Sequence, residues 1–378
     1  MIKKAYKYRL HPNKTQEQKL NQTFGCTRLV WNNCVYMFNN HSNIKSIPEL
    51  KTEYEFLKDV SAATLQQKQR DFVEFKKQFF SKNRKKKINK PRFKKKGVND
   101  SFRLPNQKFK LIDNKIQLEK IGKIKIVIDR LIPENAKLLS VTVSRNSCGQ
   151  YFASVLVEQE TIKLKKTNKS IGCDLGIKSF LVTNDEVFEN PKYFRESQAK
   201  LKKAQQKLSK KQKGSNRYNK FKLRVAKIHN KVKNQRSHYI HQITNKLVTN
   251  YDVISIEDLN VSGMIKNKKL SKSISDASFS IFKNQLTYKC NWYGKELFVV
   301  DRFFASSKTC SNCGAIKKDL KLKDRIYKCG ECGLQIDRDL NAAINLKNKA
   351  IGVNVAQRTQ SNSKTSSEAN CNEVSKMN

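Results

Sequence analysis

The amino-acid sequence predicts a chain of α/β class that also contains a small β-barrel and helical parts. The evidence is the hydrophobic periodicity in three successive regions. It is helical to about Phe80, falls to two between Ser101 and Glu158, and then alternates between short apolar strands and long helices. At 378 residues, the chain is long enough for two or three domains.

The first residues predict a strand followed by a long helix. Residues 2–10 alternate apolar and basic side chains, as a strand does, and Pro12 ends the alternation. Thr15 and Gln18 have the spacing of a capping box, which predicts the start of a helix. Apolar residues then recur every three or four positions, so we expect one buried stripe: Leu20, Phe24, Thr27, Trp31, Cys34 and Phe38.

A strongly basic run follows the helical region. Residues 82–96 contain ten lysines and arginines and no acidic residue. Such a run is either a solvated linker or a direct contact for phosphates, and the presence of Pro91 and Phe93 within it keeps both interpretations open. A stretch this charged is not expected in a hydrophobic core.

Residues 101–158 have the period of two that is typical of β-strands. Residues 123–128 alternate cleanly, and a turn at 146–149 separates two further alternating segments, which predicts a hairpin. Together these strands predict a small β-barrel. If the strand over residues 2–10 pairs into the same barrel, the helices between them are an insertion.

The second half predicts strands that alternate with helices. Residues 170–180 predict an apolar strand that turns into a second one, and residues 252–257 and 297–300 predict two more. Two long helices joined by a turn at 214–216 predict an antiparallel hairpin whose outer faces are rich in lysine and arginine. A last helix is expected from about Asp339.

The net charge points to a nucleic-acid partner. Lysines and arginines number 78 against 32 acids, a formal net charge of +46, and a compact chain tolerates this self-repulsion best when a polyanion neutralises it. No segment has the length of a transmembrane helix, so we expect no membrane partner. The N-terminus lacks an apolar signal core, and six cysteines have no regular spacing, which predicts a reducing, cytoplasmic compartment: Cys26, Cys34, Cys148, Cys173, Cys290 and Cys371.

Four cysteines near the C-terminus have the spacing of a metal site. Cys310 and Cys313 form one Cys-x2-Cys knuckle, and Cys329 and Cys332 form a second after fifteen intervening residues. Two-residue gaps allow both sulfurs of a knuckle to reach one tetrahedral zinc ion, whereas the alternative is a pair of disulfides. Four protein ligands leave no position for water, so the predicted zinc is structural and a catalytic metal must lie elsewhere.

Three acidic residues lie where a hydrophobic core does not favour them. Asp174 lies within an apolar strand, Glu257 ends another, and Asp339 opens the last helix. Singly, each has an ordinary explanation as a cap or an ion-pair partner, and either Asp337 or Asp339 could cap that helix. Together, carboxylates at two strand ends and a helix start can converge and bind two divalent cations for phosphodiester hydrolysis.

Several short motifs resemble one known family. In order along the chain they are Asp174-Leu175-Gly176, Ile256-Glu257-Asp258-Leu259, Thr309-Cys310-Ser311-Asn312-Cys313-Gly314 and Asp337-Arg338-Asp339-Leu340-Asn341-Ala342-Ala343. They resemble TnpB, the RNA-guided endonuclease that insertion sequences encode and that is related to type V CRISPR effectors. The segment Tyr8-Arg9-Leu10-His11-Pro12-Asn13 also resembles the start of that family, so the similarity spans nearly the whole chain.

The resemblance implies the catalytic residues and the cofactors. The acids of the family fall on Asp174, Glu257 and Asp339, because the third acid stands two residues before the Asn of the Asn-Ala-Ala run, and Asp337 is left as the helix cap. These acids are expected to hold two catalytic magnesium or manganese ions, and the four cysteines to hold the structural zinc. None of the acids is substituted here, whereas family members used as repressors are expected to have lost them.

The resemblance also implies a domain order. It predicts an RNase H-like (RuvC) nuclease domain that is interrupted by a zinc ribbon and preceded by a wedge-type β-barrel carrying an inserted helical recognition domain. The expected ranges are 1–10 for the first barrel strand, 11–98 for the recognition domain with its basic linker, 99–167 for the rest of the barrel, 168–304 for the first part of the nuclease with the basic hairpin, 305–335 for the ribbon, 336–352 for the last nuclease helix and 353–378 for a disordered tail.

The function that this implies is RNA-guided, metal-dependent cleavage of double-stranded DNA beside a short adjacent motif. The expected partner is a guide RNA from the transposon end, and we expect a monomer. Two other hypotheses use the same charge and zinc: a nucleic-acid-binding repressor that does not cleave, and a transposase that acts directly on DNA ends. The intact acids disfavour the first, and a requirement for guide RNA in cleavage separates the second.

Overall fold

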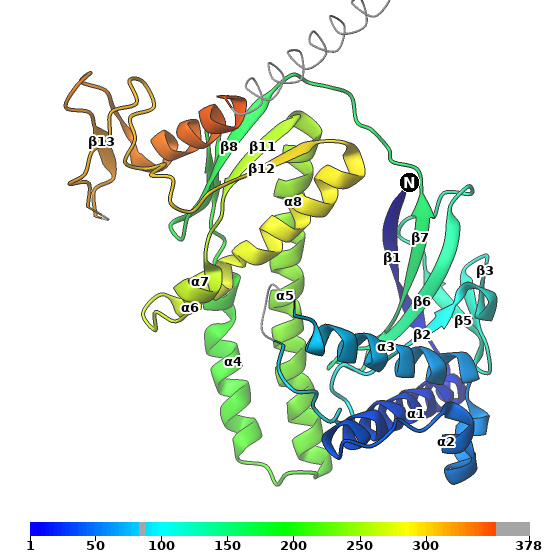
Figure 1. Cartoon of the computed structure of the whole chain (residues 1–378). Helices are drawn as coiled ribbons and strands as arrows, with labels where there is room; N and C mark the ends of the chain where they lie inside the picture. Colours follow the sequence, from blue (N-terminus) through cyan, green and yellow to red (C-terminus); the bar gives the residue numbers. More distant parts are fainter. Residues whose placement is uncertain (83–87, 322, 353–378) are drawn as a thin grey trace, which may run out of the picture. The chain divides into compact units, whose positions relative to one another are not determined.

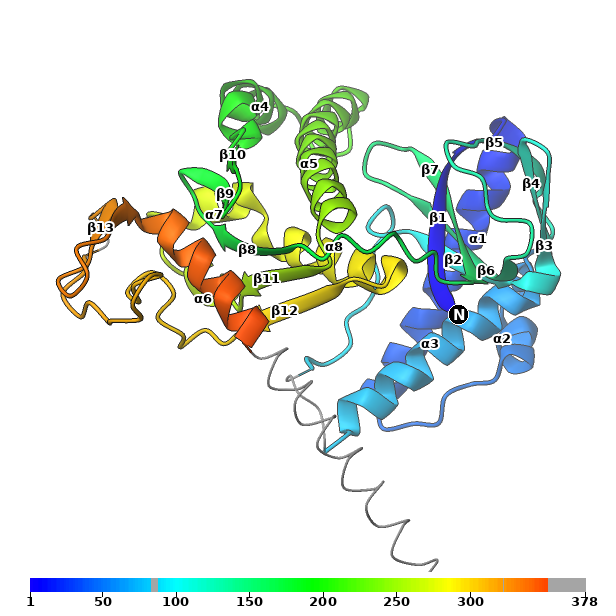
Figure 2. The ribbon, with the colours of Figure 1, turned by 90° about the horizontal axis from the view of Figure 1, so that it is seen from above.

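The computed structural model describes residues 1–82, 88–321 and 323–352, and the chain forms two compact units. The first unit comprises residues 1–160 and 211–227, and the second comprises the rest; their elements are labelled in Figure 1 and Figure 2. Part of the basic run (83–87) and the tail predicted to be disordered (353–378) lie outside the described residues.

The first unit contains a seven-stranded antiparallel sheet that curves into a nearly closed barrel, with the order β2-β6-β7-β1-β5-β4-β3 (Figure 2). The first strand, β1 (Ile2–His11), pairs with β7 (Tyr151–Gln159) on one side and with β5 (Gly122–Val127) on the other. The remaining strands are β2 (Ser101–Pro105), β3 (Phe109–Ile112), β4 (Lys115–Leu118) and β6 (Lys137–Arg145). The predicted pairing of the N-terminal strand into the barrel is confirmed, and the helices between β1 and β2 are an insertion.

Helix α1 (Lys14–Asn39) follows β1, but its cap differs from the prediction. The capping box is formed by Asn13 and Gln16: Asn13 Oδ1 accepts from Gln16 N at 2.8 Å, and Gln16 Oε1 accepts from Asn13 N at 3.0 Å. The predicted pair, Thr15 and Gln18, is wrong because Asn13 is the last extended residue before the helix, so Thr15 already lies in the first turn.

The apolar stripe of α1 serves two hydrophobic cores. Leu20 and Phe24 pack into the barrel core among the inward-facing side chains of the strands. Further toward the C-terminal end of α1, Cys34 packs into a separate core shared with α2 (Ile47–Glu53), a 3-10 turn (Glu55–Asp59) and α3 (Ala62–Phe80). A single helix therefore joins the barrel to the helical insertion.

The second unit is built on a five-stranded mixed sheet with the order β10-β9-β8-β11-β12. Strands β8 (Ser170–Leu175), β11 (Val253–Glu257) and β12 (Glu296–Val300) are parallel. Strand β9 (Ser179–Thr183) pairs antiparallel with β8, and β10 (Val187–Glu189) pairs antiparallel with β9. The apolar strands that the sequence predicts in this half are confirmed.

Helices pack against this sheet. The predicted hairpin is formed by α4 (Tyr193–Ser209) and α5 (Asn216–Asn250), and the apolar C-terminal part of α5 packs with α8 (Phe279–Tyr293) in the core of the sheet. Two short helices, α6 (Val261–Ile265) and α7 (Ser271–Ala277), follow β11. Within the described ranges, no helix combines the length and the apolar character that crossing a membrane requires.

The last helix, residues 338–352, packs directly on β8 (Figure 1). Gly172 makes this approach possible, because a Cβ atom at that position would stand 1.9 Å from the carbonyl oxygen of Ala343 and 2.7 Å from the amide nitrogen of Lys347. Ala343 itself is fully buried. The close contact sets where the start of the last helix lies relative to the end of β8.

We predict that Gly172→Ala lowers the free energy of unfolding by about 3 kcal/mol, because the added methyl must push the last helix away from the strand. Gly352→Ala is the matched control: no atom lies within 4 Å of its new methyl, so the expected change is within about 0.5 kcal/mol. Urea denaturation measures both variants. If Gly172→Ala had the same free energy of unfolding as the wild type, the contact between Gly172 and the last helix would not be what holds the helix on the strand.

Candidate functional site

Asp174 and Glu257 are neighbours on adjacent parallel strands. The last paired residues of β8 and β11 are Cys173 and Ile256, both fully buried, and one step further along each strand come Asp174 and Glu257. Because side chains alternate along a strand, the two carboxylates lie on the face opposite to these buried side chains. Both acids are only partly buried.

Asp339 reaches the same face of the sheet from the last helix. Gly172, which that helix covers, precedes Asp174 by two residues and so points to the same face, and Asp339 lies one helical turn before Ala343. Burial is the main cause that raises the pKa of Asp174 to about 7, and the negative charges of Asp339 and Glu257 add to it. The three carboxylates therefore lie within electrostatic range of one another.

Asp174 and Glu257 differ from the neighbouring acid Asp258 in the interactions that their carboxylates make. Among the described residues, neither Asp174 nor Glu257 makes a hydrogen bond or an ion pair through its carboxylate. Burial is the main cause that raises the pKa of Glu257, and the negative charge of Asp258 raises it further. Asp258 is instead held by Lys283 at 2.6 Å and by Arg302. This pairing lowers the pKa of Asp258 and identifies it as a structural residue.

Asp337 and Asp339 also differ in role. The Asp337 carboxylate accepts from the backbone nitrogens of Asp339 and Leu340, at 2.9 and 3.1 Å, so Asp337 caps the last helix as expected. The Asp339 carboxylate lies 3.8 Å from Arg325 and 3.7 Å from Arg338, which are loose ion-pair distances.

The donor set fits divalent cations. Carboxylates that are withdrawn from water without a partner are costly, and hard oxygen donors are the ligands that magnesium and manganese prefer. The three carboxylates do not form a tight cluster, because in the described part of the chain only the four cysteines bring three or more ligand atoms within 4.8 Å of one another. Asp174, Glu257 and Asp339 would hold the cations, which would supply Lewis-acid activation of water for phosphodiester hydrolysis.

The four cysteines converge on one point. The Sγ atoms of Cys310 and Cys332 are 3.6 Å apart, as are those of Cys313 and Cys329, and all four lie within 4.8 Å of one another. All four are free thiols, which excludes the alternative of two disulfides. Tetrahedral zinc with bonds of about 2.3 Å needs sulfurs about 3.8 Å apart, so the group fits zinc.

The cysteine ribbon, residues 305–335, is tied to the last helix by two asparagines that the sequence analysis missed. Asn341, fully buried, accepts from Ser311 N at 3.0 Å and donates to Thr309 O at 2.7 Å. One turn on, Asn345 donates to Thr309 O at 2.6 Å and to Ser306 O at 2.8 Å. The signal in the sequence is a polar residue at each of two successive turns on the buried side of an alanine-rich helix.

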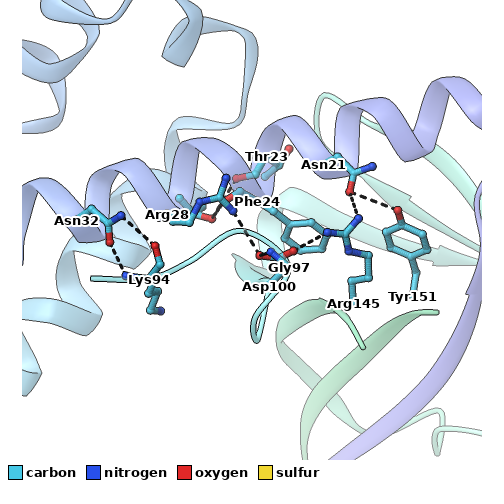
Figure 3. A network of polar contacts seen from close by, with 11 residues as sticks. Asn21, Thr23, Phe24, Arg28, Asn32, Lys94, Gly97, Asp100, Arg145 and Tyr151 are labelled. Carbon is cyan, nitrogen blue, oxygen red and sulfur yellow. Dashed lines mark hydrogen bonds and ion pairs between the residues drawn. The ribbon is translucent and has the colours of Figure 1, made fainter. Parts of the chain in front are cut away.

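The described part of the basic run, residues 88–96, is anchored to α1. Trp31 Nε1 donates to Arg92 O at 3.1 Å. The side chain of Asn32 bonds the backbone of Lys94 twice, accepting at 2.7 Å and donating at 3.1 Å (Figure 3). We call this anchored segment, residues 88–96, the strap; its anchoring does not decide between a solvated linker and a phosphate contact, because most of its basic side chains are exposed.

Lys94 is the exception to the expectation that the run stays clear of packed side chains. Its ammonium lies 4.3 Å from the centroid of the Trp31 ring. Burial and the neighbouring charge of Lys68 lower the pKa of Lys94 to about 8. The other basic side chains of the strap remain exposed: Lys90, Arg92, Lys95 and Lys96.

Three family models match parts of this chain. Residues 154–268 match a family described as "Probable transposase", and residues 279–346 match a "Cas12f1-like, TNB domain". Residues 1–37 match a family described as a "Helix-turn-helix domain". In this chain, that last region forms strand β1 and most of α1.

Two relatives match almost end to end. A protein of Streptomyces pristinaespiralis named "Putative RNA-guided DNA endonuclease" is 36% identical over 361 residues, which cover 91% of this chain and 89% of the relative. InsQ of Escherichia coli K12, which carries the same description, is 32% identical over 373 residues, covering 90% and 91%. The chain belongs to the TnpB family.

A solved structure shares the fold of this TnpB-family chain. It is a Cas12f1 chain in a complex with sgRNA and target DNA, with a TM-score of 0.53 over 92% of this chain and 98% of that chain. The sequence identity is 14%, so the match concerns the fold alone.

We predict that the purified TnpB-family protein contains about one zinc ion per chain and that Cys332→Ser reduces this content to near zero, because three sulfurs bind zinc far more weakly than four. Cys148→Ser, a cysteine outside the cluster, should leave the content unchanged. Elemental analysis of the protein measures the metal. Equal zinc in both variants would contradict the assignment of the four ligands.

Proposed function

We propose that this chain is an RNA-guided DNA endonuclease whose divalent-metal site is formed by Asp174, Glu257 and Asp339. The observation that carries the proposal is that the charges of Asp339 and Glu257 both add to the raised pKa of Asp174, while Asp174 and Glu257 make no hydrogen bond or ion pair through their carboxylates among the described residues. The contact of the last helix with Gly172 brings Asp339 toward the strand that carries Asp174. The names of the two relatives that match almost end to end support the activity.

The finer architecture that we propose is a RuvC-like nuclease of the RNase H type. The strand order β10-β9-β8-β11-β12 supports it. In this sheet β8 and β11 are parallel, and β9 runs antiparallel to β8. The cysteine ribbon interrupts this domain between β12 and the last helix. The barrel of the first unit corresponds to a wedge domain, and helices α1 to α3 correspond to an inserted recognition domain.

The three acids of the site would act together as metal ligands, and the neighbouring Asp258 would not. Two bound divalent cations supply Lewis-acid activation of water and stabilisation of the leaving oxygen. Asp174 and Glu257 would hold them from adjacent strands, and Asp339 from the helix. Asp258 stays with its two basic partners and is thereby kept from competing for metal.

The charge supports the binding of guide RNA and double-stranded target DNA. A net charge of +46 suits a protein that clamps phosphate backbones while base pairing supplies the sequence specificity. The lysines of the α4–α5 hairpin and of the strap are exposed and so available to phosphates. We propose that the protein acts as a monomer in the cytoplasm, with RNA derived from the transposon end.

Cleavage assays with single variants test the site. Asp174→Ala, Glu257→Ala and Asp339→Ala should each reduce cleavage of a guided target by a factor of about 1,000 or more while RNA binding is kept, because phosphate contacts supply most of the affinity. Asp337→Ser and Asp258→Asn are matched controls, since the first keeps a capping side chain and the second removes an acid that basic residues hold. Full activity in Asp339→Ala would refute the assignment.

The two other hypotheses give different results in the same assay. A repressor binds guide and target without cutting in any variant, and a transposase cuts without guide RNA. Sequencing the RNA that copurifies with the protein provides the guide for the assay. A single abundant structured RNA is the expected finding.

We predict that changing Lys82, Lys90, Lys95 and Lys96 together to Gln weakens nucleic-acid binding for every sequence and flattens the log–log salt dependence by about one unit per lost phosphate contact. The control is a variant with the same charge change on the outer faces of β3 to β5, at the exposed residues Lys110, Lys115, Lys123 and Lys125. Affinity for one target is measured across a salt series. An unchanged slope in the variant of the basic run would mean that residues 82–96 do not touch phosphates.

A further inference from the structure

A cavity of about 720 Å³ lies in the first unit beside α1, on a side of the helix that the apolar stripe does not occupy. One wall comes from α1, through residues that include Gly25, Arg28, Asn32 and Tyr36, and the other wall comes from the segment around α2 that ends at Phe56. The volume is within the range of small-ligand sites in proteins. None of the functions assigned above uses this cavity.

The lining combines aromatic rings with amides and cations. Tyr36 is 57% exposed and Phe56 is 47% exposed, and the rings of Phe56 and Tyr54 stand 5.9 Å apart at an interplanar angle of 60°. Asn33 also lines the cavity, and its Oδ1 atom is buried and has no hydrogen-bond partner in the part of the chain that the structure describes. Large aromatic rings left exposed at a polar cavity cost free energy unless a ligand covers them.

Gly25 occupies the interior of α1 without a need in the fold. Glycine is the least favourable helix residue after proline. A Cβ atom at Gly25 would meet only the Nη2 atom of Arg28, at 3.8 Å, which is an ordinary contact distance. The missing side chain leaves the α1 backbone open to the cavity, as at sites where a ligand approaches a backbone closely.

The same face of α1 holds the basic strap and the chain that follows it. Arg28 lies 3.4 Å from the buried Asp100, which Arg145 of β6 also binds at 2.7 Å, and Asn32 binds Lys94 (Figure 3). Asn32 therefore lines the cavity and holds the strap backbone at Lys94 at the same time, and Arg28 lines the cavity and binds Asp100. The cavity and the strap thus share Asn32 as a common wall and anchor.

We propose that this cavity binds one unpaired nucleobase of the nucleic acid whose backbone the strap holds. A base is planar and stacks on aromatic rings whatever its identity, and side-chain amides can pair with its edge. The net positive charge of the chain favours an anionic ligand over a neutral or cationic one, and the aromatic rings of the lining favour a nucleobase among anionic ligands. The inference rests on the proposed binding of nucleic acid, and its test needs no cleavage.

Gly25→Leu tests the proposal, because leucine is a good helix former that fills the cavity from the helix side. The probes are fluorescent twelve-nucleotide oligomers of uridine and of deoxythymidine, with anisotropy recorded across a salt series. We expect a fivefold to hundredfold loss of affinity with an unchanged salt slope, since stacking releases no counterions, and with a thermal midpoint at or above that of the wild type, since leucine favours the helix. Loss for the RNA oligomer alone assigns the base to RNA, and loss for the DNA oligomer alone assigns it to DNA.

Two further variants test whether the loss of affinity comes from the lining of the cavity. Tyr36→Ala with Phe56→Ala should reproduce the loss, whereas Phe80→Ala, an aromatic residue with 63% exposure outside the lining, should not. Photo-crosslinking of wild-type protein to the uridine oligomer carrying 5-iodouridine should label Tyr36, Tyr54 or Phe56. Unchanged affinity of Gly25→Leu for both oligomers, or crosslinks only at other residues, would overturn the proposal. Failure of the wild type to bind either oligomer would instead refute the nucleic-acid function itself.

Discussion

The contact between Gly172 and the backbone of Ala343 is the constraint on which the nuclease unit depends. It joins a strand to a helix more than 160 residues later in the chain, at a distance that leaves no room for a side chain. Through it, Asp339 is positioned beside Asp174, and the asparagines that follow it hold the cysteine ribbon. The acids that we propose as metal ligands and the ribbon therefore share one support, which is what a metal site requires of its ligands.

The electrostatics of the unit support the same assignment. An aspartate whose pKa rises to about 7, mainly through burial and further through the negative charges beside it, is unfavourable for stability, whereas the neighbouring acids Asp258 and Asp337 have basic or backbone partners. Asp258 has its lysine and arginine, and Asp337 has the start of the last helix. Of the three acids that the resemblance assigns to metal, Asp174 and Glu257 have no such partner among the described residues, and Asp339 has only the loose ion pairs with Arg325 and Arg338.

The sequence predicted most strands and the cluster of four cysteines, because each depends on local pattern, whereas the site of the three acids stays a prediction. Alternation located β1, β5 and the parallel strands, and the two knuckles named their four ligands. The contacts between distant segments could not be predicted from the sequence. Nothing near Gly172 indicates that Ala343 will cover it, and the hydrogen bonds of Asn341 exist only because the ribbon lies next to the last helix. The cap of α1 failed for a local reason, since Asn13 and Thr15 offer equally good capping side chains two residues apart and the end of β1 decides between them.

The most direct test of the central claim is to count divalent cations on the protein. Titration of magnesium-free protein with Mn²⁺, with free manganese followed by its electron paramagnetic resonance signal, should give about two sites per chain in the wild type and in Asp258→Asn. Glu257→Gln, which keeps the shape of the side chain and removes its charge, should lose at least one of them. Equal manganese binding by Glu257→Gln and the wild type would contradict the account.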